Sequence, residues 1–232
     1  MISLPRAAAL VAALSFGGAA SSSAHAQAVD VGLVLAVDVS GSVNGERYGL
    51  QMNGIADAFE DRSVQDAILS GPRHAIAITL VQWSDKPKIS VPWTVIASVG
   101  DAAAFAAKVR SAPRLASEFT CMAQMMRFVA DKVLPRIPRR ADRTVVDVSG
   151  DGHDNCNPPV PVDAVRDELT GGLVTINGLP ILEGDEAETL ASWYRDHVIG
   201  GAGAFLLPAA GFRDFGRAIR QKFITEVSAL PR

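Results

Sequence analysis

The sequence predicts a doubly wound α/β fold, with a mostly parallel six-stranded sheet and helices on both faces. Short apolar runs rich in β-branched residues alternate along the chain with segments whose apolar residues recur at helical spacing. The runs are apolar at nearly every position, which is typical of strands buried on both faces of a parallel sheet. No internal repeat or linker-like tract interrupts this alternation, so we expect one domain over residues 29–230.

Six segments are expected to form the strands. Residues 31–37 are an almost continuous apolar run. Residues 88–91 lie just before Pro92, which has no backbone N–H to donate, and therefore read as an edge strand or hairpin partner. The other four expected strands are residues 74–83, 144–148, 173–177 and 204–207.

The segments between the strands carry helical patterns. Asn44 precedes apolar residues spaced one turn apart and is a suitable N-cap. Asp101 is the expected cap of a second helix, and Pro135 is expected to end a third because proline breaks helices. The six expected helices cover residues 44–59, 101–110, 120–134, 162–169, 186–197 and 212–227.

The first 26 residues have the pattern of a secretory signal peptide. A short positive start ending at Arg6 precedes the uncharged apolar run Ala7–Ala20, and Ala24-His25-Ala26 is a suitable cleavage site. The alternative, an N-terminal membrane anchor, would need a longer apolar run. We therefore expect residues 1–26 to be removed, no membrane insertion after cleavage, and a periplasmic or secreted protein.

The charge balance argues against two classes of partner. The formal net charge is −3, with 22 basic and 25 acidic residues among 232. A nucleic-acid-binding protein normally has a basic surface, and this composition gives no sign of one. The acidic balance likewise gives no reason to expect binding to an anionic membrane surface.

Polar residues follow two of the expected strands where a parallel sheet binds ligands. Asp38, Ser40 and Ser42 come directly after the first strand, Asp151 follows the strand at residues 144–148, and Thr120 begins an expected helix. Ligands of such sheets bind beyond the carboxyl ends of the strands. Carboxylate and hydroxyl oxygens suit a hard divalent cation, so we expect a Mg²⁺ site, with Mn²⁺ or Ca²⁺ as alternatives.

The motif Asp38-Val39-Ser40-Gly41-Ser42 resembles the DxSxS motif of von Willebrand factor A domains, which carry a metal-ion-dependent adhesion site. The chain is also similar to the DUF1194 family, exported bacterial proteins of this type with unknown function. That similarity rests on the segments 37–42, 147–152 and 194–201. The resemblance implies that Ser40, Ser42 and Thr120 bind the metal directly, and that Asp38 and Asp151 support it.

Each of the two cysteines lies a short distance after one of these candidate site residues. Cys121 follows Thr120, and Cys156 lies shortly after Asp151. If both loops meet at the metal, a disulfide between the two cysteines would tie the loops together, and an exported protein favours such a bond. The alternative is a pair of reduced, buried thiols.

The leading functional hypothesis is a binding module, not an enzyme, whose metal captures an Asp or Glu side chain of a protein partner. A metal-dependent hydrolase or phosphatase is the second hypothesis, and its general base would be His153 or Asp154. A metal-free structural module is the third. The segment from Asp151 to Cys156 could form a zinc site, but one His and one Cys are few ligands for zinc. The glycine-rich segment at residues 200–203 precedes an expected strand, so we interpret it as a turn and not a nucleotide loop.

Overall fold

The computed structural model describes residues 27–115, 117–156 and 159–228. The expected signal peptide, residues 1–26, and the last two residues of the expected domain, 229–230, lie outside this range. None of the described helices combines the length and the apolar character that crossing a membrane requires.

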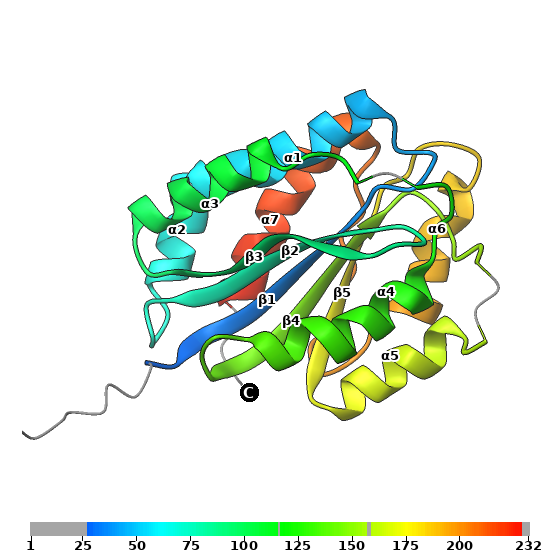
Figure 1. The fold of residues 1–232 in the computed structure, drawn as a ribbon. Coiled ribbons are helices and arrows are strands. Elements are labelled where there is room, and N and C mark those ends of the chain that lie inside the picture. The colour runs from blue at the N-terminus through cyan, green and yellow to red at the C-terminus, as the bar shows by residue number, and fades with distance from the viewer. Residues whose placement is uncertain (1–26, 116, 157–158, 229–232) are drawn as a thin grey trace, which may run out of the picture.

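A five-stranded sheet forms the centre of the molecule, in the order β3-β2-β1-β4-β5 (Figure 1). Its strands are β1 (Val29–Asp38), β2 (Ile76–Trp83), β3 (Lys88–Ile96), β4 (Ala141–Gly150) and β5 (Val174–Pro180). All neighbours are parallel except β2 and β3, which form an antiparallel hairpin at one edge. The predicted fold class is confirmed, and β1 lies at the centre because its apolar residues are buried on both faces.

The prediction of six strands was wrong, because residues 204–207 do not form a strand. This segment runs beside β5 and makes only isolated bridges, such as Gly178 with Leu206. The side-chain oxygen of Asn177 accepts the N–H of Phe205, and Pro208 has no N–H to contribute to a continuous ladder. The glycine-rich segment before it is a turn, as expected, with positive φ at Gly201 and Gly203.

Helices cover both faces of the sheet (Figure 1). One face carries α1 (Gly45–Glu60), α2 (Arg62–Leu69), α3 (Val99–Ser111) and α7 (Phe215–Ser228), which share a hydrophobic core with that side of the sheet. The other face carries α4 (Met122–Phe128), α5 (Val162–Gly171) and α6 (Ala187–Trp193) over a second core. Short π-helical segments, Val129–Val133 and Tyr194–Val198, follow α4 and α6, while 3-10 turns lie at Leu134–Arg136 and Phe212–Asp214.

Side chains cap the starts of α1, α2 and α3, with one correction to the prediction. Asn44 caps α1 as predicted, accepting the N–H of Arg47 at 2.9 Å. Asp101 is not the cap of α3, since Ser98 occupies that position and accepts the N–H of Asp101. Asp101 instead accepts the N–H of Ala97 and the hydroxyl of Ser98, so the two side chains support this helix start together.

Candidate metal site

The predicted site residues meet at the carboxyl ends of the central strands. Asp38 is the last residue of β1, and Asp151 follows the last residue of β4, the strand that pairs with β1 in parallel. Thr120 reaches the same edge from the loop before α4 and lines one cavity together with Ser42 and Asp151. That cavity has a volume of about 300 Å³.

Hydrogen bonds order the loop after β1. The Asp38 carboxylate is fully buried, and its Oδ1 accepts the N–H of Ser40 at 2.8 Å. The hydroxyls of Ser40 and Ser42 lie 3.3 Å apart, and Ser42 donates to Asp151 Oδ1 at 2.7 Å. These contacts therefore join four of the five predicted residues in one connected set: Asp38, Ser40, Ser42 and Asp151.

The fifth residue, Thr120, is held by the loop that carries Asp151. Its N–H donates to the side chain of Asn155 at 2.8 Å, and its carbonyl accepts the N–H of Asn155 at 3.0 Å. The structure also contains the predicted disulfide between Cys121 and Cys156, whose Cα atoms lie 5.1 Å apart. Backbone, side chain and disulfide thus fix the position of Thr120 relative to the Asp151 loop.

The electrostatics of this edge favour a cation. Burial, and next the charge of Asp151, raise the pKa of Asp38 to about 7, while the hydrogen bond from Ser40 opposes that rise. Burial also raises the pKa of Asp151. The Oδ2 atom of Asp38 and the hydroxyl of Tyr194 are buried and make no hydrogen bond to any described residue. A positive ion near Asp38 would reduce the repulsion between Asp38 and Asp151 and would give the buried oxygen a partner.

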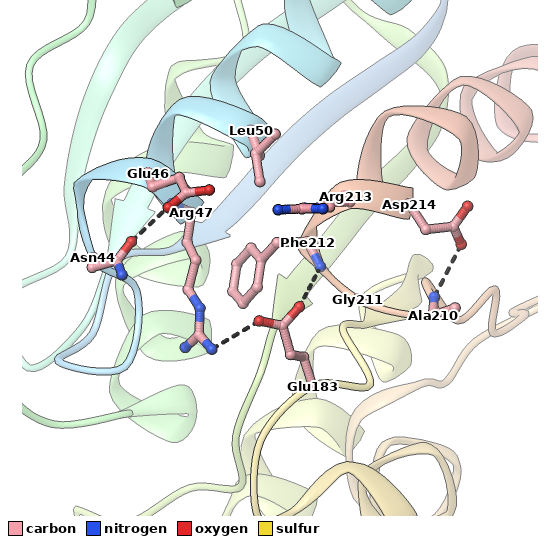
Figure 2. A pocket seen from close by; sticks show the side chains of 10 residues that line it. All are labelled: Asn44, Glu46, Arg47, Leu50, Glu183, Ala210, Gly211, Phe212, Arg213 and Asp214. Atoms are coloured by element: carbon pink, nitrogen blue, oxygen red, sulfur yellow. Dashed lines mark hydrogen bonds and ion pairs between the residues drawn. The ribbon is translucent and has the colours of Figure 1, made fainter.

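An arginine already compensates part of the negative charge. Arg47, in the first turn of α1, lies 3.6 Å from Asp151 Oδ2 and donates to the carbonyl of Ser42 at 2.7 Å. Its other nitrogen donates to Glu183 Oε1 at 2.8 Å, and the guanidinium lies over the ring of Phe212 (Figure 2). Glu183 Oε2 in turn accepts the N–H of Phe212. These contacts link the loops after β1, β4 and β5 to the start of α7.

Sequence reasoning missed Arg47, Glu183 and Tyr194. Glu183 follows β5, so the rule that ligands bind at the carboxyl ends of parallel strands could have found it. Arg47 lies five residues after Ser42 in a helix whose exposed side carries other charges, and spacing alone does not distinguish it. Tyr194 begins the π-helical segment after α6, and its buried hydroxyl lies near Asp38 because this segment packs against the sheet.

The donor set fits a hard cation. Two carboxylates and three hydroxyls offer oxygen ligands only, which Mg²⁺, Mn²⁺ and Ca²⁺ prefer. Across the described ranges, no three His, Cys, Asp or Glu side chains gather closely enough to hold a metal. A metal at this edge would therefore depend on the hydroxyls of Ser40, Ser42 and Thr120.

The contacts of the segment from Asp151 to Cys156 do not favour the alternative sites. Cys156 is in the disulfide and is not available as a thiolate ligand for zinc. Asp154, one candidate general base, accepts the backbone N–H groups of Ala123 and Cys156. His153, the other candidate, lines the cavity but stacks on Trp193 with ring centroids 5.0 Å apart.

Comparisons with known proteins identify a family and a set of similar folds. A family model described as "Protein of unknown function (DUF1194)" matches residues 28–231. A search of curated proteins found no match.

Solved structures of proximal thread matrix protein 1 from the mussel byssus resemble the fold. One crystal form has a TM-score of 0.65 at 15% identity, and a form with a zinc-occupied MIDAS motif has a TM-score of 0.62 at 15% identity. In both cases the match covers 86% of this chain and 48% of the other. The chain thus spans about half the length of these neighbours, and the likeness concerns the fold.

Proposed function

The chain belongs to the DUF1194 family of proteins of unknown function and has a von Willebrand factor A-like fold, and we propose that it is an exported, metal-dependent module that binds a protein partner. The observation that carries the proposal is the meeting of Asp38, Ser40, Ser42, Thr120 and Asp151 at one sheet edge. There, one buried oxygen of Asp38 has no hydrogen-bond partner among the described residues. The MIDAS motif of the structurally similar mussel protein supports the same assignment.

In this proposal the hydroxyls of Ser40, Ser42 and Thr120 hold a divalent cation directly, while Asp38 and Asp151 support it. The bound cation supplies a Lewis-acidic position for a carboxylate oxygen of the partner, an Asp or Glu side chain. Mg²⁺ is the proposed physiological ion because the donors are hard oxygens. The disulfide supports the proposed export, since such bonds persist in oxidising compartments.

Titration calorimetry tests the metal site. The purified protein is titrated with Mg²⁺, Mn²⁺, Ca²⁺ and Zn²⁺, and we expect binding at one site per chain. Asp38→Asn keeps the size of the side chain but removes its charge, and it should abolish binding. The matched control is Asp185→Asn, which removes an exposed acid from the rim of the same cavity and should leave the affinity within about threefold. Unchanged affinity in Asp38→Asn would contradict the assignment.

Partner capture is tested separately. The protein is immobilised and exposed to the exported protein fraction with Mg²⁺ and with chelator, and bound proteins are identified by mass spectrometry. The proposal expects a partner that is retained with Mg²⁺, released by chelator, and not retained by Asp38→Asn. A partner that stays bound under chelator would show that recognition does not use the metal.

We propose a binding module and not a hydrolase because the candidate bases have other contacts. Asp154 accepts two backbone N–H groups, and His153 stacks on Trp193 while its backbone donates to Glu186. A screen of phosphatase and esterase substrates with Mg²⁺ or Mn²⁺ should therefore show no turnover above that of Asp38→Asn. Metal-dependent turnover that this variant lacks would favour the hydrolase hypothesis.

A further inference from the structure

A second group of charged side chains lies in the core between α7 and the sheet, away from the metal site. Lys222 and Glu226 of α7, Asp147 of β4 and Asn177 of β5 are all at least 98% buried. The Nζ atom of Lys222 lies 2.9 Å from Asp147 Oδ1 and in hydrogen-bond contact with Glu226 Oε1. Asn177 Nδ2 donates to the same Glu226 oxygen at 2.7 Å.

This group is shielded from bulk solvent by apolar and backbone neighbours. The Nζ atom of Lys222 lies 4.9 Å from the centre of the Phe205 ring, and Oε2 of Glu226 makes no hydrogen bond to the described part of the chain. Arg143 donates to the backbone carbonyl of Glu226 and not to a carboxylate. One amine therefore faces two carboxyl groups inside the core.

Burial favours the uncharged form of the Asp147 carboxyl group. Burial, and next the charge of Glu226, raise the pKa of Asp147 to about 7, while the charge of Lys222 opposes that rise, so part of the carboxyl population is protonated near neutral pH. A buried ion pair loses the hydration of both ions, and proton transfer from ammonium to carboxylate removes both charges. A neutral amine next to a neutral carboxylic acid has the protonation states needed for amide formation.

We propose that Lys222 and Asp147 condense to an intramolecular isopeptide bond. The lone pair of Lys222 Nζ attacks Cγ of protonated Asp147 and forms the N–C bond. The C–O bond to the hydroxyl group then breaks, and the oxygen leaves as water with one proton from the carboxyl group and one from the amine. No electrons are gained or lost, and no co-reactant is needed.

Glu226 is placed to transfer the proton in this reaction. Its Oε1 contacts the attacking nitrogen, and its charge acts on the Asp147 carboxyl group. Glu226 accepts a proton from the nitrogen and returns it to the departing hydroxyl group, a general acid–base role. Asn177 holds Glu226 in position from β5. The product joins α7 covalently to β4, the strand that leads to Asp151.

Mass spectrometry of the reduced, exported protein tests the bond without any variant. The expected result is a chain lighter than its sequence by one water molecule. After protease digestion, one cross-linked peptide should contain both Lys222 and Asp147. A full, unmodified mass with two separate peptides would overturn the proposal. A deficit of one ammonia molecule would also overturn it, since that product requires Asn177 to be the acyl donor.

Three variants separate the roles of the residues. Lys222→Arg should restore the full mass, and Glu226→Gln should leave most molecules unlinked because the proton carrier is lost. The matched control is Lys108→Arg, at an exposed lysine of α3, which should keep the deficit of one water. A complete cross-link in Glu226→Gln would contradict the role of Glu226. The wild-type mass decides the bond itself even where a variant does not fold.

Discussion

At the scale of single residues, the site depends on the cost of burying carboxylates. Asp38 accepts one hydrogen bond from Ser40, but its second oxygen has no partner in the described part of the chain, and the carboxylate of Asp151 lies nearby. A protein that left this charge uncompensated would lose stability. The metal-free protein can avoid this cost only by keeping Asp38 protonated, whereas metal binding requires the ionised carboxylate.

This competition predicts opposite pH dependences with and without metal. The pKa of Asp38 rises from 3.8 in the unfolded chain to about 7 in the folded one, so the unfolded state releases this proton at lower pH. In chelator, the free energy of unfolding should therefore fall as pH rises from 4 to 7. Each pKa unit corresponds to about 1.4 kcal/mol, which gives a change on the order of a few kcal/mol. With saturating Mg²⁺, the increase in the free energy of unfolding that the metal causes should instead grow with pH.

Denaturant unfolding at several pH values, in chelator and in Mg²⁺, measures both trends. Asp38→Asn serves as the reference, because the amide does not titrate in this range. The slope attributed to Asp38 is the difference between wild type and this variant in chelator. Identical pH profiles for the two proteins would show that Asp38 ionises normally in the folded state.

The sequence predicted that these residues share one edge of the sheet, but not which residues surround them. Asp38, Ser40 and Ser42 follow a buried strand in a motif, and Asp151 follows a second one, so their order along the chain indicated a shared edge. The position of Arg47 depends on the direction of α1 over the sheet, which no local pattern encodes. Glu183 could have been predicted from its position just after the carboxyl end of β5.

At the scale of elements, local patterns predicted the centre of each segment better than its ends. The structure extends β3 through Pro92, because this edge strand needs fewer backbone donors than a central one. The short helix α2 was not predicted, since a single residue, Asp61, separates it from α1 and serves as its cap. The segment at residues 204–207 has the apolar character of a strand, but side-chain contacts replace part of its ladder.

The packing of α1 against α7 gives a prediction with an internal control. A Cβ atom added at Gly54 would lie 2.9 Å from the Cα of Gly216, whereas one added at Gly216 would lie 3.5 Å from the Cα of Gly54. Gly54→Ala must therefore separate the two helices and should cost about 1–3 kcal/mol. Gly216→Ala meets ordinary van der Waals distance and should be neutral or stabilising by up to about 1 kcal/mol, because alanine favours helix.

Thermal and denaturant unfolding of the two alanine variants measures this difference. Both add the same methyl group to the same helix–helix contact, so hydrophobicity alone predicts equal effects. Equal stabilities would show that α1 and α7 separate without cost at this position.

At the scale of the whole molecule, the disulfide and the candidate metal site involve the same two loops. The disulfide joins residues 35 positions apart, and the closed segment contains β4 and the Asp151 loop. Restricting the unfolded chain in this way should contribute about 3–4 kcal/mol. The bond also fixes Thr120 beside Asp151, so it links global stability to the geometry of the candidate site.

The double variant Cys121→Ser and Cys156→Ser separates these two effects. Without metal it should unfold with a free energy lower by about 3–4 kcal/mol, because the unfolded chain regains the freedom of the closed segment. At a temperature where it stays folded, its affinity for Mg²⁺ should fall by about tenfold or less, since Asn155 still holds the backbone of Thr120 through two hydrogen bonds. Unfolding experiments and calorimetry on the same sample measure both quantities. Complete loss of metal binding in the folded variant would mean that the disulfide alone positions Thr120. Unchanged affinity would mean that Thr120 is not a ligand or needs no restraint from this bond.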